Sequence, residues 1–318
     1  MNKYRAWNRF ASSVKIRRAL GEGEALEGKS NLSNLGGGCA IDLQEESGMS
    51  IIVISKGSYN RGKEVAEKLA QKLGYKCISR EVLIDASEQF NIPEIKLEKA
   101  LYDAPSFLDR FSYGKDKYLT YIACAFLRQL AQDDIIYHGF GGHAFVQGVS
   151  HVLKVRVTAD MEDRIKLVME RDNVPADKAR DSIKKVDEER RKWNLFVTGI
   201  DPYDPTYYDM IFHIKTMTAD DVADIISNAV KLPCFHTTPE AQKKINELLL
   251  AAEVKTAIVD QFPKAEVSSK DGSVFVSVKA PLEQQEKIST KVKELVKDID
   301  GIKEVVVSAK AYIYWDTS

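Results

Sequence analysis

A glycine-marked turn that ends in a lysine is the first group of residues whose types and spacing suggest chemistry. Gly57, Gly62 and Lys63 fit the G-x-x-x-x-G-K part of a phosphate-binding loop, in which backbone N–H groups and the lysine hold anionic oxygens. A strict loop continues with Ser or Thr, whose hydroxyl contacts Mg²⁺, whereas this chain continues with Glu64. Taken alone, the motif fits a phosphate site and an ordinary strand-to-helix turn about equally well.

The residues on either side of this turn predict the elements that would position it. The β-branched run 51–54 predicts a buried strand, and the turn is followed by a helical pattern whose apolar face carries Val65, Ala66, Leu69 and Leu73. In a strand–turn–helix unit, the N–H groups of the turn and the positive end of the helix dipole face the same point. An anion would be held there.

A second group lies between His138 and His143, where three glycines follow the apolar strand pattern 135–137. Glycines let backbone approach a ligand closely, although a tight turn with positive φ explains them as well. The two histidines lack further Cys, His or carboxylate residues at ligand spacing, so we expect no metal site here.

A third group is a cation-rich helical stretch between the strand patterns 152–157 and 210–214. In phosphoryl-transfer enzymes, a helical hairpin at such a position closes over the nucleotide, and its arginines neutralise charge on the transferred group. Guanidinium groups suit this task because they donate two hydrogen bonds in one plane. A solvated helix face is the ordinary alternative. The residues concerned are Arg164, Arg171, Lys184, Asp187, Arg190 and Arg191.

Strand and helix patterns alternate from residue 49 to about 232, which predicts an α/β fold with a parallel sheet and helices on both faces. Ligands of such sheets bind at the carboxyl ends of the strands, where the Gly57 turn lies. The expected strands are 51–54, 76–79, 135–137, 152–157 and 210–214, and the expected helices are 61–73, 80–90, 94–102, 115–132, 160–172, 175–193 and 218–230.

The chain divides into three parts. Residues 1–48 include a Gly-, Ser- and Glu-rich stretch and predict a flexible N-terminal extension. Residues 49–234 carry the α/β pattern. Residues 235–318 predict a small α+β domain with helices at 239–261 and 281–299 and strands at 273–280 and 302–313.

Bulk composition limits the classes of function. The 318 residues are 44% hydrophobic and 29% charged, as in a globular protein, and their net charge of −1 argues against a broad nucleic-acid-binding surface. No apolar run approaches the roughly 18 residues of a membrane span. The four cysteines are scattered and lack metal-ligand spacing, which favours a reducing cytoplasm. We expect no nucleic-acid partner and leave a homo-oligomer open.

Residues 49–232 resemble the cytidylate-kinase-like family of P-loop nucleoside monophosphate kinases. The resemblance rests on several motifs together, since each is weak alone. The first loop, residues 55–66, aligns without gaps with the family's relaxed S-R-x-x-G-S-G-G-R-E-I-A. The other motifs are residues 79–83, an R-I pair at Arg164, the A-x-x-x-I-x-x-x-D-x-x-R pattern over 179–190, Tyr208-Asp209, and T-x-x-D-V-A over 218–223.

This resemblance implies a P-loop kinase fold with a helical lid that transfers the γ-phosphoryl group of ATP, with Mg²⁺, to a nucleotide or similar small acceptor. It implies catalytic roles for Lys63, Asp187, Arg190 and Arg191. Donor-phosphate contacts fall on Gly57, Ser58, Asn60, Arg61, Gly62, Lys63 and Glu64, and acceptor, lid or hinge contacts fall on Ser79, Arg80, Gly139, Gly141, Arg164, Arg171 and Lys184.

Several positions depart from the family pattern. Tyr59 and Asn60 replace two glycines of the loop, Phe140 replaces the arginine that would touch the acceptor, and Glu64 stands where a strict loop has a hydroxyl. These changes leave open a second hypothesis, a regulatory protein that binds a nucleotide without turning it over.

Residues 271–309 resemble a BON domain through Asp271-Gly272-x-Val274 and the ending Gly301-Ile302-x-x-Val305. The resemblance implies a module that binds a protein, a ligand or a phospholipid surface and is not an enzyme, and a generic α+β module is the alternative. It motivates a third hypothesis, in which the C-terminal domain tethers the chain to a membrane or envelope.

Overall fold

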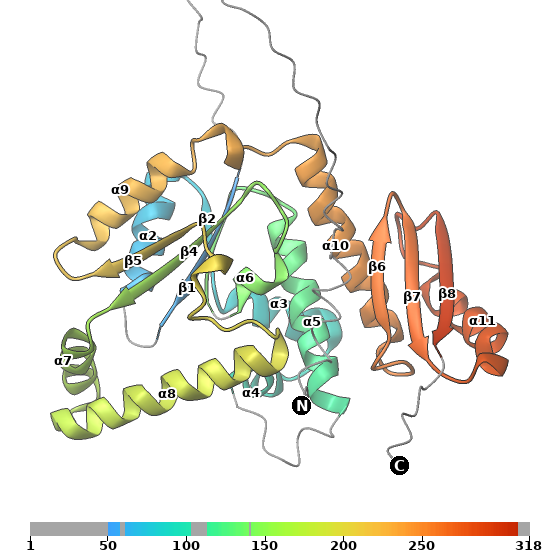
Figure 1. The fold of residues 1–318 in the computed structure, drawn as a ribbon, viewed down its shortest axis with the longest axis horizontal. Helices are drawn as coiled ribbons and strands as arrows, with labels where there is room; N and C mark the ends of the chain where they lie inside the picture. Colours follow the sequence, from blue (N-terminus) through green and yellow to red (C-terminus); the bar gives the residue numbers. More distant parts are fainter. Residues whose placement is uncertain (1–49, 58–60, 103–112, 140, 311–318) are drawn as a thin grey trace, which may run out of the picture.

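A five-stranded parallel sheet forms the centre of the larger part of the molecule. The structure is a computed structural model that describes residues 50–57, 61–102, 113–139 and 141–310. The strands are β1 (Ile51–Lys56), β2 (Lys76–Ile78), β3 (Ile135–Gly139), β4 (Val152–Ala159) and β5 (Met210–Ile214). Their order is β2-β3-β1-β4-β5, and every neighbouring pair is parallel (Figure 1).

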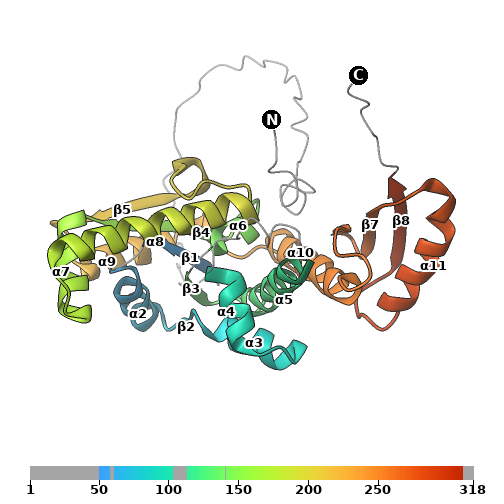
Figure 2. The same ribbon diagram turned by 90° about the horizontal axis from the view of Figure 1, so that it is seen from below.

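Helices cover both faces of this sheet because its central strands are apolar on both sides. Ile52 and Ile54 of β1 pack against α2 (Gly62–Leu73) and α9 (Ala219–Ala229). Ile51 and Val53 point to the opposite face and join a second core cluster. Four helices on that face contribute side chains to the cluster, α3 (Glu81–Phe90), α4 (Glu94–Tyr102), α5 (Tyr113–Leu130) and α6 (Gly142–Phe145), and two later helices add to it (Figures 1 and 2).

A helical hairpin follows β4, as expected. It consists of α7 (Met161–Asp172) and α8 (Ala176–Val197), and a short 3₁₀ helix, η2 (Pro205–Tyr207), precedes β5. The hairpin has a small core of its own, formed by Ile165, Val168, Ala179 and Ile183. Fully buried Trp193, near the end of α8, belongs instead to the core cluster of the α5 face. The base of the hairpin is therefore fixed to the sheet.

The C-terminal part is a three-stranded mixed sheet with helices on one face. The 3₁₀ helix η3 (Pro233–Phe235) and α10 (Pro239–Ile258) lead into β6 (Glu266–Lys270), β7 (Ser273–Lys279), η4 (Leu282–Gln284), α11 (Gln285–Val296) and β8 (Glu304–Lys310). β6 and β7 are antiparallel, whereas β7 and β8 are parallel. The alternating valines of β7 face α11, which explains their spacing.

Helix α10 belongs to both parts of the molecule. Ile245 and Ala252 join the core cluster beneath the large sheet, whereas Val254 and Ile258 join the core of the small sheet. Figures 1 and 2 show α10 between the two sheets and beside α5. The predicted division at 234/235 remains a prediction, and α10 contributes apolar side chains on both sides of it.

The expected strands and helices of residues 49–232 are confirmed to within a few residues. The expected helix 281–299 is wrong at both ends, because α11 spans residues 285–296 and a 3₁₀ turn precedes it. Short α6, whose four residues follow the glycine turn, was not expected. Residues 1–48 lie outside the described residues. Within the described chain, no helix is long and apolar enough to cross a membrane.

Candidate active site

The turn between β1 and α2 lies at the carboxyl edge of the sheet. The Gly57 N–H donates to the Val157 carbonyl oxygen of β4 at 3.4 Å, which holds the start of the turn beside the neighbouring strand. Ser58 and Asn60 lie outside the described residues. Arg61 is the N-cap residue of α2, and its side chain does not cap the helix. A helix start without a side-chain cap, together with the helix dipole, favours a bound anion.

Charged side chains surround the start of α2. Arg61 Nε lies 3.7 Å from Glu64 Oε2, and Lys63 Nζ lies 3.5 Å from Glu67 Oε1. The four side chains are between 46% and 66% exposed. Because exposed pairs of this kind contribute only about 0–1 kcal/mol, Arg61 and Lys63 can exchange them for phosphate oxygens at little cost.

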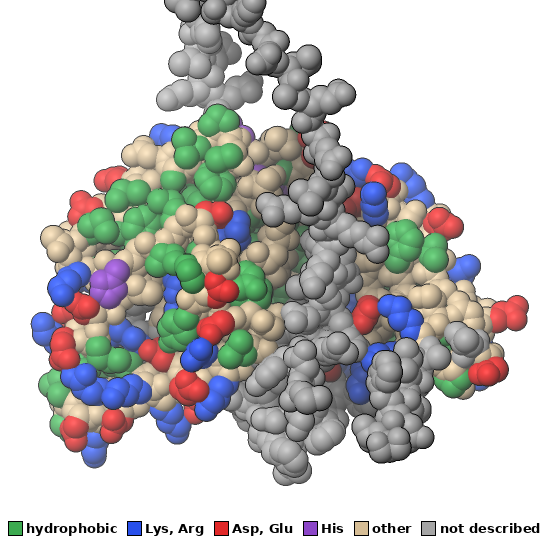
Figure 3. Space-filling model, in the orientation of Figure 1, with side chains coloured by type: hydrophobic (Ala, Val, Ile, Leu, Met, Phe, Trp, Pro, Cys, Tyr) green, Lys and Arg blue, Asp and Glu red, His purple; other side chains and the backbone are tan. Residues whose placement is uncertain are grey.

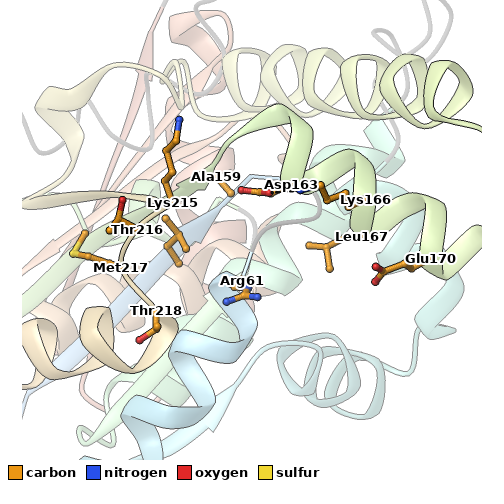
Figure 4. A pocket seen from close by; sticks show the side chains of 11 residues that line it. Arg61, Ala159, Asp163, Lys166, Leu167, Glu170, Lys215, Thr216, Met217 and Thr218 are labelled. Carbon is orange, nitrogen blue, oxygen red and sulfur yellow. Dashed lines mark hydrogen bonds and ion pairs between the residues drawn. The ribbon is translucent and has the colours of Figure 1, made fainter.

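A cavity of about 390 Å³ adjoins this turn. Figure 4 shows Arg61 at the start of α2, with Leu167 of α7 on one side and Met217 of the loop after β5 on the other. The size of the cavity and its mixture of apolar and polar lining residues suit a small ring such as a nucleobase. The lining residues are Arg61, Ala159, Asp163, Lys166, Leu167, Glu170, Ile214, Lys215, Thr216, Met217 and Thr218.

Two ion pairs hold charged residues of the hairpin. Arg164 of α7 donates to Asp187 of α8 at 2.6 Å, and the two side chains are only 12% and 18% exposed. Arg191 Nη2 donates to Asp201 at 2.7 Å, and this hydrogen bond lowers the pKa of the Asp201 carboxyl. Elsewhere over the hairpin, Figure 3 shows exposed charges of both signs beside one another. Part of the α7–α8 hairpin is therefore an ordinary solvent-exposed helix face.

Tyr203 connects the hairpin with the sheet. Its ring centroid lies 4.9 Å from Cζ of Arg156 on β4 and 5.5 Å from Cζ of Arg191 on α8. The charges of Arg164 and Asp187 also act on its hydroxyl. We call this group the Tyr203 cluster, and its members are Arg156, Arg164, Asp187, Arg191, Asp201 and Tyr203.

The hydroxyl of Tyr208 lies at the inner side of this cluster. It is 3.2 Å from the Pro202 carbonyl oxygen, 3.4 Å from Ser55 Oγ, 3.4 Å from Arg156 Nη1 and 3.5 Å from His143 Nε2. Burial and the nearby charge of Arg156 lower the pKa of His143 to about 3. His143 is therefore neutral at neutral pH, so it is suited to hydrogen bonding and not to carrying charge.

The Tyr208-Asp209 motif has a structural explanation. Asp209 accepts hydrogen bonds from the backbone N–H and from Nζ of Lys154, both at 2.8 Å. These bonds join the residue before β5 to the beginning of β4. The neighbouring Tyr208 is thereby held against the sheet.

The residues expected on the acceptor side lie at the start of α3. The Ser79 N–H donates to Glu81 Oε2 at 2.6 Å, and Arg80 Nε donates to Glu94 Oε1 at 2.6 Å, which joins α3 to α4. These hydrogen bonds of Ser79 and Arg80 involve no member of the Tyr203 cluster. The acceptor roles of Ser79 and Arg80 remain predictions.

The hairpin brings together some of its predicted residues and separates others. Arg164, Asp187 and Arg191 meet around Tyr203. Arg171 lies in the last turn of α7, where it pairs with adjacent Asp172. The others are placed on α8, where Lys184 is exposed and the Arg190 carbonyl oxygen accepts a hydrogen bond from Asn194.

The glycines after β3 are explained by packing. Gly141 has a φ of +71° and is the N-cap of α6. A Cβ at Gly139 or Gly142 would overlap the ring of Tyr137. These requirements account for all three glycines without a ligand, and the binding roles of Gly139 and Gly141 remain predictions. Phe140 lies outside the described residues.

Arg156 is a site residue that the sequence patterns did not single out. It lies within the mostly apolar strand β4. The pattern of apolar residues predicts a strand there but gives no sign that Arg156 belongs to a site. The available signal was an arginine in the middle of a strand expected to be buried on both faces, since such a cation requires a partner.

A family model described as the cytidylate kinase-like family matches residues 51–216. A cytidylate kinase from Sulfolobus acidocaldarius is 26% identical over 187 residues, which cover 58% of this chain and 97% of that protein. The matched family residues run from β1 to just beyond β5, so they contain the turn, the Tyr203 cluster and most of the cavity.

Solved structures with a similar chain course are more distant in sequence. A protein from Eubacterium ventriosum is 19% identical, with a TM-score of 0.43, and the match covers 57% of this chain and 98% of that one. A shikimate kinase from Bacteroides thetaiotaomicron is 14% identical, with a TM-score of 0.37 and coverage of 58% and 99%.

Proposed function

Because this chain belongs to the cytidylate kinase-like family, we propose that it is a phosphotransferase of the nucleoside monophosphate kinase type. It moves the γ-phosphoryl group of ATP to a nucleotide or a similar small phosphorylated acceptor. The match of the family model to residues 51–216 and the parallel sheet with helices on both faces support this proposal.

One observation carries the proposal. The β1–α2 turn and the 390 Å³ cavity share the carboxyl edge of the parallel sheet, with Arg61 in both. Donor phosphates on the turn and the donor base in the cavity would therefore form one continuous site. Leu167, Ile214 and Met217 supply the apolar surface for the base.

The reaction would depend on position and charge. An acceptor oxygen forms a bond with the γ-phosphorus while the bond from that phosphorus to the β–γ bridging oxygen breaks, and ADP leaves. Lys63 and Arg61 would hold the donor oxygens, and Arg190 and Arg191 would neutralise charge on the transferred group. Asp187 would orient Arg164 through the 2.6 Å ion pair.

Magnesium would bind with the nucleotide and neutralise charge between its β- and γ-phosphates. The residues present fit this ion. Glu64, in the first turn of α2, has a side chain that is 46% exposed, and Mg²⁺ takes carboxylate and water oxygens readily. Glu64 could thus replace the hydroxyl of a strict loop. Within the described residues, no group of three or more His, Cys, Asp or Glu side chains forms a metal site.

A second candidate is a regulatory protein that binds the nucleotide without transfer. The observation that favours it is the pairing of the hairpin cations, since Arg164 and Arg191 already have carboxylate partners. The glycine replacements Tyr59 and Asn60 add to it. In this version the C-terminal part, proposed as a BON-like module, would report the bound state to a protein or ligand partner.

An acceptor panel tests the proposal. The full chain is incubated with ATP, Mg²⁺ and each of a set of nucleoside monophosphates, including CMP, and both ADP and the phosphorylated acceptor are measured. We expect equal amounts of the two products with at least one acceptor. Nucleotide-induced thermal stabilisation without any phosphorylated product would instead favour the regulatory protein.

A further inference from the structure

Arg156 is a buried cation that the roles above leave unexplained. It is 7% exposed and lies on β4, between β1 and β5 of the large sheet. Among the described residues, its one hydrogen bond runs from Nη1 to the Tyr208 hydroxyl at 3.4 Å, and none of the ion pairs includes it. Burying a cation without an anion costs free energy, so the arginine indicates a partner that binds from outside the chain.

Aromatic rings surround Arg156 but do not supply an anion. Its Cζ lies 4.9 Å from the ring centroid of Tyr203 and 5.6 Å from that of Tyr208. Such cation–π contacts position a guanidinium and stabilise it in part. They leave its in-plane N–H groups available for a planar or tetrahedral oxyanion.

The Tyr203 cluster has an excess of positive charge. Its three arginines face two carboxylates, and those carboxylates pair with Arg164 and Arg191. The difference of three and two leaves one positive charge, on Arg156. A buried nitrogen near Tyr208 is unsatisfied, because Nδ1 of fully buried His143 has no hydrogen-bond partner in the described structure.

The position of Arg156 places it beside the donor site. Arg156 stands opposite Ser55 in the β1–β4 register, and Gly57 begins the phosphate turn two residues later. Ser55 Oγ and Arg156 Nη1 both lie 3.4 Å from the Tyr208 hydroxyl. An anion at Arg156 would therefore lie close to the point where the transferred group leaves the donor.

We propose that Arg156, Tyr203 and Tyr208 form the subsite that binds the acceptor's anionic group, a phosphate monoester. This inference rests on the proposed phosphotransferase function and names the residues that hold its acceptor. The chain has Phe140 after β3, where the family resemblance implies an acceptor-binding arginine. A guanidinium from β4, which is separated from β3 by β1, would supply that charge instead.

Inorganic phosphate is the probe for this subsite. The thermal midpoint of the full chain is measured with increasing phosphate, with chloride adjusted to keep the ionic strength constant. The variants are Arg156→Met, Arg156→Lys and Lys63→Ala, and Arg180→Gln is the matched control because Arg180 is an exposed arginine paired with Glu162. Phosphate raises the midpoint wherever it binds the folded chain.

We expect the apparent affinity for phosphate to fall about 10- to 100-fold in Arg156→Met, because a charged hydrogen-bond donor is lost. In Arg156→Lys the apparent affinity for phosphate should fall less, because lysine retains the positive charge but lacks the planar set of donors. Arg180→Gln keeps the wild-type response, and Lys63→Ala loses only the part of the shift that comes from phosphate bound at the β1–α2 turn. Without phosphate, Arg156→Met should melt at or above the wild-type midpoint, because removing an uncompensated buried cation relieves the folded state.

The proposal is wrong if the wild type gives no phosphate-dependent shift, or if Lys63→Ala alone removes the shift. It is also wrong if Arg156→Met melts below the wild type and keeps the full response, since Arg156 would then be structural. None of these measurements needs turnover. Phosphate binding through Arg156 without any transfer would refute the proposed function only, whereas an active enzyme whose acceptor KM is unchanged in Arg156→Lys would refute the subsite only.

Discussion

Buried single residues set the electrostatics of the candidate site. His143 and Arg156 are both buried beside Tyr208, and one is neutral while the other carries a charge. Burial is the main reason for the low pKa of His143, and the positive charge of the neighbouring Arg156 lowers this pKa further. Because its pKa is low in the folded chain, His143 makes the free energy of unfolding depend on pH even without a bound ligand.

Acid should destabilise the protein through His143. Its pKa is about 3 in the folded chain and about 6.5 in the unfolded chain, so between these values only the unfolded chain takes up the proton. The free energy of unfolding should therefore fall as pH falls from about 6.5 toward 3, by about 2 kcal/mol between pH 7 and pH 5. Urea unfolding at the two pH values measures the change.

His143→Gln should reduce this pH-dependent loss of stability by about the same amount, because the glutamine side chain does not bind a proton in this range. His236→Gln is the matched control, since His236 is less buried than His143 and hydrogen-bonds to the Lys231 carbonyl oxygen. An equal pH dependence in the wild type and His143→Gln would contradict the assignment.

At the scale of elements, the α7–α8 hairpin is joined by ion pairs of two kinds. The Arg164–Asp187 pair is largely buried, whereas the Arg180–Glu162 pair is exposed. Buried pairs lose more when one partner is removed, because the remaining charge stays desolvated. The two pairs connect the same helices, so they form a matched comparison.

Asp187→Asn should lower the free energy of unfolding by about 1–3 kcal/mol, because the largely buried ion pair with Arg164 would be lost. Glu162→Gln, which removes the exposed partner, should change it by less than about 0.5 kcal/mol. Denaturant unfolding of both variants gives the comparison. Equal losses, or a larger loss in Glu162→Gln, would show that burial does not determine the strength of these pairs.

The elements themselves could mostly be predicted from the sequence. The apolar run that forms β1 and the amphipathic pattern that forms α2 are strong local signals, and together they predicted the position of the β1–α2 turn. The partners of single residues could not be predicted in this way. Arg156 meets Tyr203 only because the chain after α8 returns over β4, and Gly139 is required by the ring of Tyr137.

At the scale of the whole molecule, α10 connects two sheets that sequence patterns assign to separate domains. Its residues alternate between two cores, with Ile245 in the first and Val254 in the second. Arg128 of α5 also donates to Glu253 of α10 at 2.6 Å. Because one rigid helix contributes to both cores, disturbance in one should reach the other.

Ile245→Ala should lower the free energy of unfolding by about 2–5 kcal/mol, because it leaves a cavity in the core below the large sheet. Hydrogen exchange should accelerate in β7 as well as in β1, since α10 couples the two parts. Exposed Asn246→Ala on the same helix is the control and should change neither. Faster exchange confined to β1 would show that the two parts unfold independently.

We propose phosphoryl transfer at the β1–α2 turn, and a comparison of turnover between the wild type and two lysine variants is the test. Formation of ADP and phosphorylated acceptor is measured for the wild type, Lys63→Ala and Lys72→Ala. Lys72 lies in the last turn of the same helix, pairs with Asp224 and is the matched control. We predict that Lys63→Ala lowers kcat/KM at least about 100-fold, as loss of a charge-stabilising donor does elsewhere, while Lys72→Ala keeps wild-type turnover. Unchanged turnover in Lys63→Ala would contradict the claim.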